Sequence, residues 1–169
     1  MMLILRRPPV SPYVIEMYEW FDRPKVISLI LEYPQPCKVL RKFITDLHKL
    51  NELISRSLMC QLVLAVQHCI DHGVFHNDIH ADNILVNTCS LELKLIDFGC
   101  AHLVDSNGYN STQYLGKLAF CITVYFVFYY CIGMETSCRD LISQCLNRSP
   151  AKRLTLEQIL QHEWLNNQC

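Results

Sequence analysis

The stretch that decides the fold is HCIDHGVFHNDIHADNILV, residues 68–86, which carries a histidine at every fourth position. These histidines are His68, His72, His76 and His80. On one continuous helix the four imidazoles would share a face and form a candidate metal site. Gly73 argues against that helix, because glycine is a common helix terminator. We expect the first two histidines to end a helix and the last two to lie in a loop, which removes the geometry of such a site.

Two strands and a linker are expected near the N-terminus. Residues 13–20 and 26–32 are rich in β-branched and aromatic side chains and predict antiparallel strands, joined by a turn at residues 22–24. The sequence YPQP, residues 33–36, predicts a linker, because its two prolines donate no backbone hydrogen bond.

Helices are expected on both sides of the histidine stretch. Residues 38–47 predict a short helix, and residues 52–72 predict a long one in which apolar side chains recur at steps of three and four. Near the C-terminus, residues 136–147 and 155–165 predict two further helices, separated by a break at Ser149-Pro150.

Two short strands are expected after the histidine stretch, at residues 84–86 and 93–96. Residues 118–134 then carry no charged side chain. Their length favours a buried or half-buried core helix, with a membrane segment or a strand-like segment as alternatives.

Composition sets the broad class of the protein. The chain has 169 residues, of which 51% are hydrophobic and 18% charged, as in a globular domain. Its net charge of −1 predicts neither nucleic acid nor an anionic membrane as a partner. The N-terminus lacks a signal-peptide cleavage pattern, and the ten cysteines are scattered without a C-x-x-C pair. These features predict reduced thiols and a location in the cytosol or the nucleus.

The chemistry is expected from Asp78, Asn83 and Asp97, two carboxylates and a carboxamide. They form the spacing H-x-D-x-x-x-x-N followed by D-F-G, which resembles the catalytic loop and magnesium-binding motif of eukaryotic protein kinases. In phosphoryl transfer an acid orients the substrate hydroxyl, and hard oxygen ligands hold Mg²⁺ against the ATP phosphates. The resemblance implies that Asp78 is the catalytic acid/base and that Asn83 and Asp97 hold the metal.

Longer segments resemble the Pim family of serine/threonine kinases. LILEYPQP at 29–36 is similar to that family's hinge, QLVLAVQHCIDHGVFH at 61–76 to the helix before its catalytic loop, and ELKLIDFGC at 92–100 to its metal-binding strand. The segment CRDLISQCLNRSPAKRLTLEQILQHEWL at 138–165 is similar to the last two helices of the kinase C-lobe.

The resemblance implies an α+β, protein-kinase-like fold, formed mainly by the helical C-lobe with two remnant N-lobe strands. Residues 1–32 would be the N-lobe remnant, 33–36 the hinge, and 37–169 a C-lobe with a deletion near 117–135. It further implies ATP and Mg²⁺ as cofactors and a basic Ser/Thr peptide as protein substrate. The ATP-binding residues that it implies are Glu32, Pro34, Leu85 and Ile96.

Departures from the family weaken the expected activity. These 169 residues contain no glycine-rich loop and no V-A-I-K strand. Asn77 replaces the arginine of H-R-D, and His80 stands where the family has a lysine that contacts the transferring phosphate. We expect the isolated chain to be a weak or inactive kinase. A pseudokinase or binding scaffold, and an incomplete product of a longer kinase gene, are the alternatives.

Overall fold

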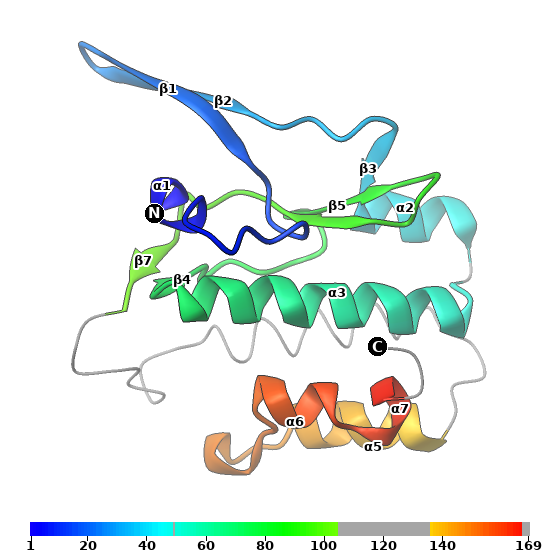
Figure 1. Cartoon of the computed structure of the whole chain (residues 1–169). Coiled ribbons are helices and arrows are strands. Elements are labelled where there is room, and N and C mark those ends of the chain that lie inside the picture. The colour runs from blue at the N-terminus through cyan, green and yellow to red at the C-terminus, as the bar shows by residue number, and fades with distance from the viewer. Residues whose placement is uncertain (49, 105–135, 167–169) are drawn as a thin grey trace.

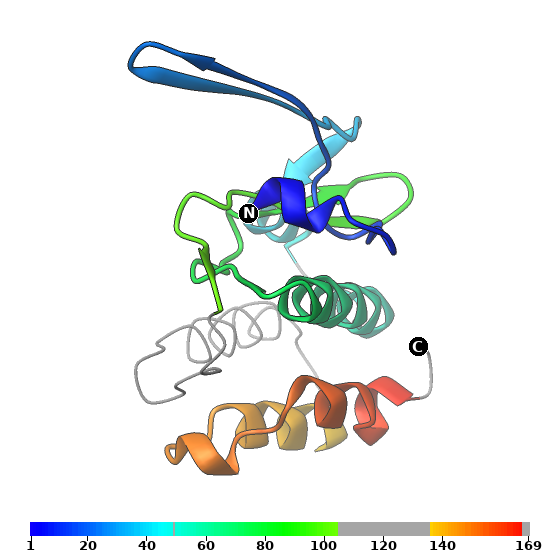
Figure 2. The ribbon, with the colours of Figure 1, turned by 60° about the vertical axis from the view of Figure 1, so that its left-hand side comes forward.

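The fold is known from a computed structural model, and it is built around one long helix, α3 (Glu52–Asp71). The described residues are 1–48, 50–104 and 136–166. Seen side-on, a small sheet and the N-terminal helix lie on one side of α3, and the C-terminal helices lie on the other (Figure 1). Figure 2 shows the same levels from a second side, with the hairpin of β1 (Met17–Arg23) and β2 (Val26–Leu31) projecting beyond the sheet. The expected α+β class is confirmed.

Local signals begin and end α3. The Asn51 side chain accepts a hydrogen bond of 2.8 Å from the Leu53 amide and so caps the first turn. Gly73 has a φ of 66°, a left-handed conformation that favours glycine after a helix. The predicted helix over 52–72 is therefore confirmed to within one residue.

A three-stranded antiparallel sheet covers α3. Its order is β3 (Cys37–Val39), β5 (Ile84–Asn87) and β6 (Leu93–Leu95). Residues 13–15 lie along the free edge of β6, where the Ile15 amide donates to the Leu95 carbonyl at 3.0 Å. The sheet side chains that turn toward the core are fully buried. They are Ile84, Val86, Leu93 and Leu95.

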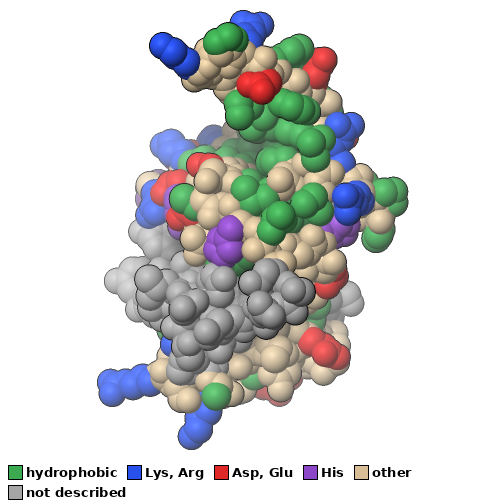
Figure 3. Space-filling model, turned by 90° about the vertical axis from the view of Figure 1, so that its left-hand side faces the viewer, with side chains coloured by type: hydrophobic (Ala, Val, Ile, Leu, Met, Phe, Trp, Pro, Cys, Tyr) green, Lys and Arg blue, Asp and Glu red, His purple; other side chains and the backbone are tan. Residues whose placement is uncertain are grey.

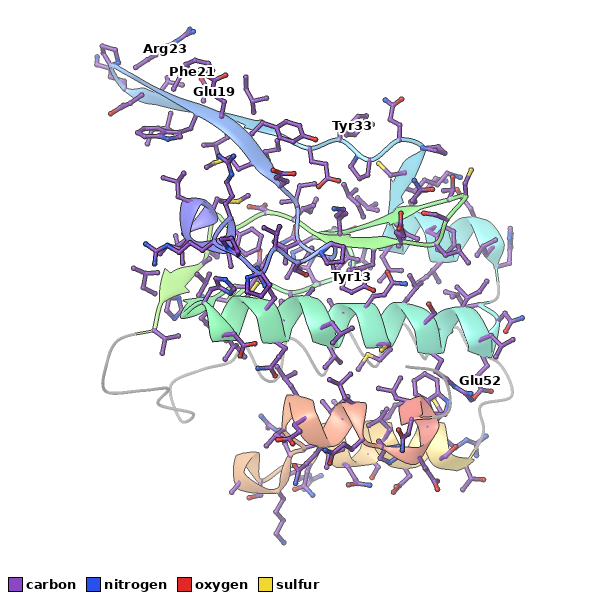
Figure 4. All side chains as sticks on the ribbon, viewed as in Figure 1. Tyr13, Glu19, Phe21, Arg23, Tyr33 and Glu52 are labelled. Carbon is purple, nitrogen blue, oxygen red and sulfur yellow. The ribbon has the colours of Figure 1, made fainter. Side chains whose placement is uncertain are left out.

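The expected strands near the N-terminus form a hairpin, β1 (Met17–Arg23) with β2 (Val26–Leu31). The antiparallel pairing is confirmed, but β1 starts four residues later than predicted and ends at Arg23, so the turn expected at residues 22–24 lies at residues 24–25. Glu19, Phe21 and Arg23 mark its course away from the sheet (Figure 4). Hydrophobic side chains crowd the hairpin surface in the space-filling view (Figure 3), and Ile27 is 66% exposed.

Two further corrections concern the helices. The segment predicted as one helix over 38–47 begins as strand β3 and becomes helical only at α2 (Leu40–Leu47). The helix expected over 155–165 is divided into α6 (Leu156–Leu160) and α7 (Glu163–Asn166). The helix expected over 136–147 is α5 (Thr136–Cys145).

Short elements complete the fold. They are α1 (Met2–Leu5), β4 (Val74–Phe75), β7 (His102–Leu103) and the 3₁₀ turn at Pro150–Lys152. β4 pairs antiparallel with β7. Leu5, Val14 and Ile15 belong to the same buried cluster as α3 and the sheet, so the first residues of the chain pack directly on this core.

The uncharged run at 118–134 and the deletion near 117–135 lie outside the described residues. The one helix that is long and apolar enough for a membrane span, among those described, is α3, and half of its apolar window is buried inside the protein. The expectation of reduced thiols holds for six described cysteines but is wrong for Cys60, which is disulfide-bonded.

Candidate functional site

The candidate site lies where the loop after β4 meets the end of β6. The loop, residues 76–83, carries Asp78 and Asn83, and β6 leads directly into Asp97. A backbone hydrogen bond of 3.0 Å from the Ile96 amide to the Asn83 carbonyl joins the two segments. The fold therefore brings the D-F-G segment beside the loop that carries the other two predicted residues.

Asn83 and Asp78 are in direct contact. The Asn83 Nδ2 donates to the Asp78 main-chain carbonyl at 2.9 Å and to the Asp78 Oδ2 at 3.1 Å. Asn83 is buried, with 7% of its surface exposed, so the orientation of its amide is set by these bonds. Because the amide nitrogen faces Asp78, the Oδ1 of Asn83 points away from it and suits a hard metal ion.

Asp97 is held in an unusual backbone conformation. Its φ is 61°, a left-handed value that costs energy for a residue other than glycine and often marks a functional site. The Gly99 amide donates to the Asp97 Oδ1 at 3.1 Å. A Cβ on Gly99 would lie 3.0 Å from that same oxygen, so glycine leaves the carboxylate room. The exposed Asp97 carboxylate is thus oriented and accessible, which fits a metal ligand.

His76 contacts the backbone beside both acids, Asp78 and Asp97. The Asp78 amide donates to its Nδ1 at 3.2 Å, so the proton sits on Nε2, which contacts the Ile96 carbonyl at 2.9 Å. The ring packs on Phe98 with centroids 4.6 Å apart. Burial lowers the pKa of His76 and outweighs the opposing influence of the Ile96 carbonyl, Asp78 and Asp97. A neutral His76 therefore ties the loop of residues 76–83 to the D-F-G segment.

The remaining loop side chains form a chain of polar contacts. The Nε2 of His80 lies 3.5 Å from the Asp78 Oδ2, and its Nδ1 lies 3.8 Å from the Asp82 Oδ2. Arg41, in the first turn of α2, pairs with Asp82 through Nε and Nη2, each at 2.8 Å. The Arg41 guanidinium lowers the pKa of Asp82. The pairing of Asp82 with Arg41 ties the loop to α2.

The predicted ATP-binding residues lie on two segments. Leu85 and Ile96 are half-buried, in β5 and immediately after β6, whereas Glu32 and Pro34 are half-buried in the loop that leaves β2. Lys94 links the two segments, because it lies opposite Leu85 in the sheet and its Nζ contacts the Glu32 Oε1 at 2.9 Å. The fold thus connects Glu32 with the β5–β6 hairpin that carries Leu85.

The four histidines of the opening stretch do not gather. His68 and His72 stack at the end of α3, with ring centroids 4.1 Å apart, whereas His76 and His80 belong to the loop of residues 76–83. Within the described part of the chain, no group of three or more His, Cys, Asp and Glu could hold a metal ion. Asn83 is not one of these residue types, so this finding does not test the metal-binding role of Asn83 and Asp97, which stays a prediction.

Sequence reasoning missed the roles of His76, Arg41 and Lys94. His76 was expected only to lie in the loop, and the first position of H-x-D was the available signal for its role. Nothing local marks Arg41 or Lys94, because their partners lie far along the chain.

The sequence of this chain is similar to those of known protein kinases. A family model described as "Protein kinase domain" matches residues 2–128. The chain is 30% identical over 189 residues to "Serine/threonine-protein kinase pim-2" of Danio rerio, an alignment that covers 90% of this chain and 61% of the relative. It is 26% identical to "Serine/threonine-protein kinase prk-2" of Caenorhabditis elegans, covering 92% and 44%.

Kinases of other families are nearly as similar. The chain is 25% identical to "NUAK family SNF1-like kinase 1" of Mus musculus, over 92% of this chain and 30% of that protein. The chain therefore spans about three fifths or less of the length of these relatives.

Proposed function

Because this chain belongs to the protein kinase family, we propose that it is a Pim-like serine/threonine kinase domain that binds Mg-ATP and acts on protein hydroxyl groups. Asp78 is the catalytic acid/base, and Asn83 and Asp97 are the metal ligands. The observation that carries this proposal is the double hydrogen bond from the Asn83 amide to Asp78, which orients the acid and the amide oxygen together.

The residues present fit the group that the family implies. Two oxygen donors, the Asn83 Oδ1 and the Asp97 carboxylate, are the ligand types that Mg²⁺ prefers. Mg²⁺ would neutralise charge on the ATP phosphates. Glu32, Pro34, Leu85 and Ile96 would hold the nucleotide base. Since its carboxylate and amide are already bonded, Glu32 would act through its main-chain carbonyl.

The protein substrate of this proposal is a basic peptide with a serine or threonine acceptor, as the Pim resemblance implies. Asp78 would accept or orient the proton of that hydroxyl. Asp82 is already engaged by Arg41, so this carboxylate would have to give up an ion pair before it could contact a basic substrate residue.

The catalytic loop favours low activity. Asn77 lacks the guanidinium that clamps a phosphorylated activation loop. His80 contacts Asp78 and Asp82 and lacks the fixed positive charge of a lysine. Losing one preorganised contact of this kind commonly costs about 3 kcal/mol of transition-state stabilisation. A pseudokinase, which binds nucleotide or a partner without turnover, is therefore the second candidate.

Thermal unfolding with and without Mg-ATP tests nucleotide binding. A ligand that binds only the folded state raises the melting temperature, and Asp97→Ala should remove that rise. The matched control is Asp140→Ala, which removes an exposed acid on α5. If Mg-ATP leaves the melting temperature of the parent chain unchanged, the proposal is wrong.

Phosphate transfer separates the two candidates. With γ-labelled ATP and a basic peptide, a weak kinase gives slow transfer that Asp78→Ala abolishes. A pseudokinase shows the thermal shift and gives the same background as the Asp78→Ala variant.

A further inference from the structure

The ion pair between Lys94 and Glu32 joins two parts of the proposed nucleotide site. One is its floor, formed by Leu85 and Ile96, and the other is the hinge, residues 33–36. The Lys94 Nζ lies 2.9 Å from the Glu32 Oε1, and only 17% and 19% of the two side chains are exposed. Such a partly buried pair is screened less by solvent and salt than a pair on the open surface. The contact therefore restrains the two segments more strongly than an exposed ion pair such as Lys38–Asp46 would.

Lys94 approaches Glu32 from the sheet face that carries Leu85. The two residues are directly opposite each other in the β5–β6 ladder, so their side chains leave the sheet on the same side. Their neighbours Leu93 and Leu95 point to the other side, into the core around α3. Lys94 thus rises from the floor beside Leu85, and its ammonium ends at the hinge.

Glu32 is held by more than one group. Its Oε2 accepts a hydrogen bond of 3.1 Å from the Glu16 amide, and its own amide donates to the Glu16 carbonyl at 2.8 Å. The other carboxylate oxygen contacts Lys94. Glu32, at the start of the hinge, is therefore bonded both to Glu16, which precedes the hairpin, and to Lys94 beside the floor.

The hinge has a second attachment at its far end. The Thr88 amide donates to the Pro36 carbonyl at 2.9 Å, in the turn that follows β5. Glu32 and Pro36 are therefore both attached to the β5–β6 hairpin, and residues 33–35 lie between these two points. Tyr33, at the start of this span, is drawn between β2 and β3 in Figure 4.

We propose that Lys94 is a positioning residue that acts through Glu32 to place the hinge over Leu85 and Ile96, and so sets the affinity for the adenine base. This inference rests on the proposed nucleotide site. It differs from the role of Asp97, because a hinge contact acts on the base, whereas a metal ligand acts on the phosphates.

Binding of adenosine and of Mg-ATP to the full 169-residue chain tests the inference. Lys94→Met should weaken both by the same factor, about tenfold, which corresponds to one substantial contact. Lys94→Arg should retain most of the affinity. Glu32→Gln keeps an acceptor for the Glu16 amide but loses the charge, so it should match Lys94→Met, and the double variant should be no weaker than either.

Controls separate this effect from the proposed metal site and from general destabilisation. Asp97→Ala should weaken Mg-ATP and leave adenosine unchanged, and Lys42→Met, which removes an exposed lysine of α2, should change neither. Unchanged adenosine affinity in a folded Lys94→Met variant overturns the inference while the proposed function stands.

Amide hydrogen exchange gives a readout that needs no ligand. Exchange at Glu16 and Glu32 should accelerate in Lys94→Met and in Glu32→Gln, and stay at the parental rate in Lys42→Met. Should the parent bind neither adenosine nor Mg-ATP, the proposed function fails, and exchange alone then decides whether Lys94 positions the hinge. Parental exchange rates in Lys94→Met overturn the inference.

Discussion

The amide of Asn83 donates to both the carboxylate and the main-chain carbonyl of Asp78, at 3.1 and 2.9 Å. One buried side chain therefore orients the predicted catalytic acid and fixes the path of the loop between them. The two bonds make the loop a stable unit before any ligand binds.

Asn83→Ala should lower the free energy of unfolding by about 1–3 kcal/mol, because the part-buried Asp78 carbonyl loses its donor. It should also remove the Mg-ATP stabilisation of the proposed function. Urea unfolding with and without Mg-ATP measures both, and Asn166→Ala, an exposed position on α7, is the control. Parental stability in Asn83→Ala would show that these hydrogen bonds contribute little.

His76 should make stability depend on pH. Burial lowers the pKa of His76 in the folded chain below the ordinary value of 6.5. Just below pH 6.5 the unfolded chain therefore binds more protons at His76 than the folded chain does. Stability is therefore full above about pH 6.5 and falls as the pH drops toward about 5, where carboxylates are still ionised. Urea unfolding across this range measures the slope.

A His76→Gln variant is the comparison for that slope, since glutamine does not titrate. It should have a shallower pH dependence, and the residual slope should come from His68, whose pKa burial also lowers. An identical slope in parent and variant would mean that His76 does not carry the effect.

The Arg41–Asp82 pair should contribute little to stability. Both side chains are nearly half exposed, at 46% and 45%, so we expect a coupling of about 0.2–1 kcal/mol despite the short contacts. Arg41 lowers the Asp82 pKa, so this contribution is present above pH 3.8 and is lost as the pH falls through the folded pKa.

A double-mutant cycle with Arg41→Met and Asp82→Asn measures that coupling by urea unfolding. In 1 M salt the coupling should shrink, because exposed charges are screened. A coupling that exceeds the expected range and persists in salt would show that the pair is more important than its exposure indicates.

Glu52 should stabilise the contact between α3 and α7. Its Oε1 accepts a hydrogen bond of 2.6 Å from the Trp164 Nε1, and the Trp164 side chain is 1% exposed. Glu52 marks the start of α3 above the C-terminal helices in Figure 4. Glu52→Ala leaves a buried indole donor without this partner and should cost about 1–3 kcal/mol.

Urea unfolding measures that cost, and Glu157→Ala, an exposed acid in the first turn of α6, is the matched control. Glu52→Gln keeps the acceptor and should lose less than Glu52→Ala. Equal losses in the two Glu52 variants would argue that the charge, and not the hydrogen bond, is what matters.

Elements with strong local signals were predicted well. The helix over 52–72 had a regular apolar period and a glycine after its end, and it is observed to within one residue. Strand β3 was missed, because three residues have no period of their own and Cys37–Val39 becomes a strand only by pairing with β5. The divided helix α6–α7 was missed for a similar reason, since its apolar residues continue across the break.

The sequence by itself determined the chemistry available at the site, since the spacing of Asp78, Asn83 and Asp97 names the acids and the amide of a kinase-like loop. Only the tertiary structure decided which groups support them: His76 on the Ile96 carbonyl, Arg41 on Asp82, and Lys94 on Glu32. The physical reason is range. Helix periods, caps and turns depend on residues a few positions apart, whereas these contacts join side chains that only strand register and core packing bring within bonding distance.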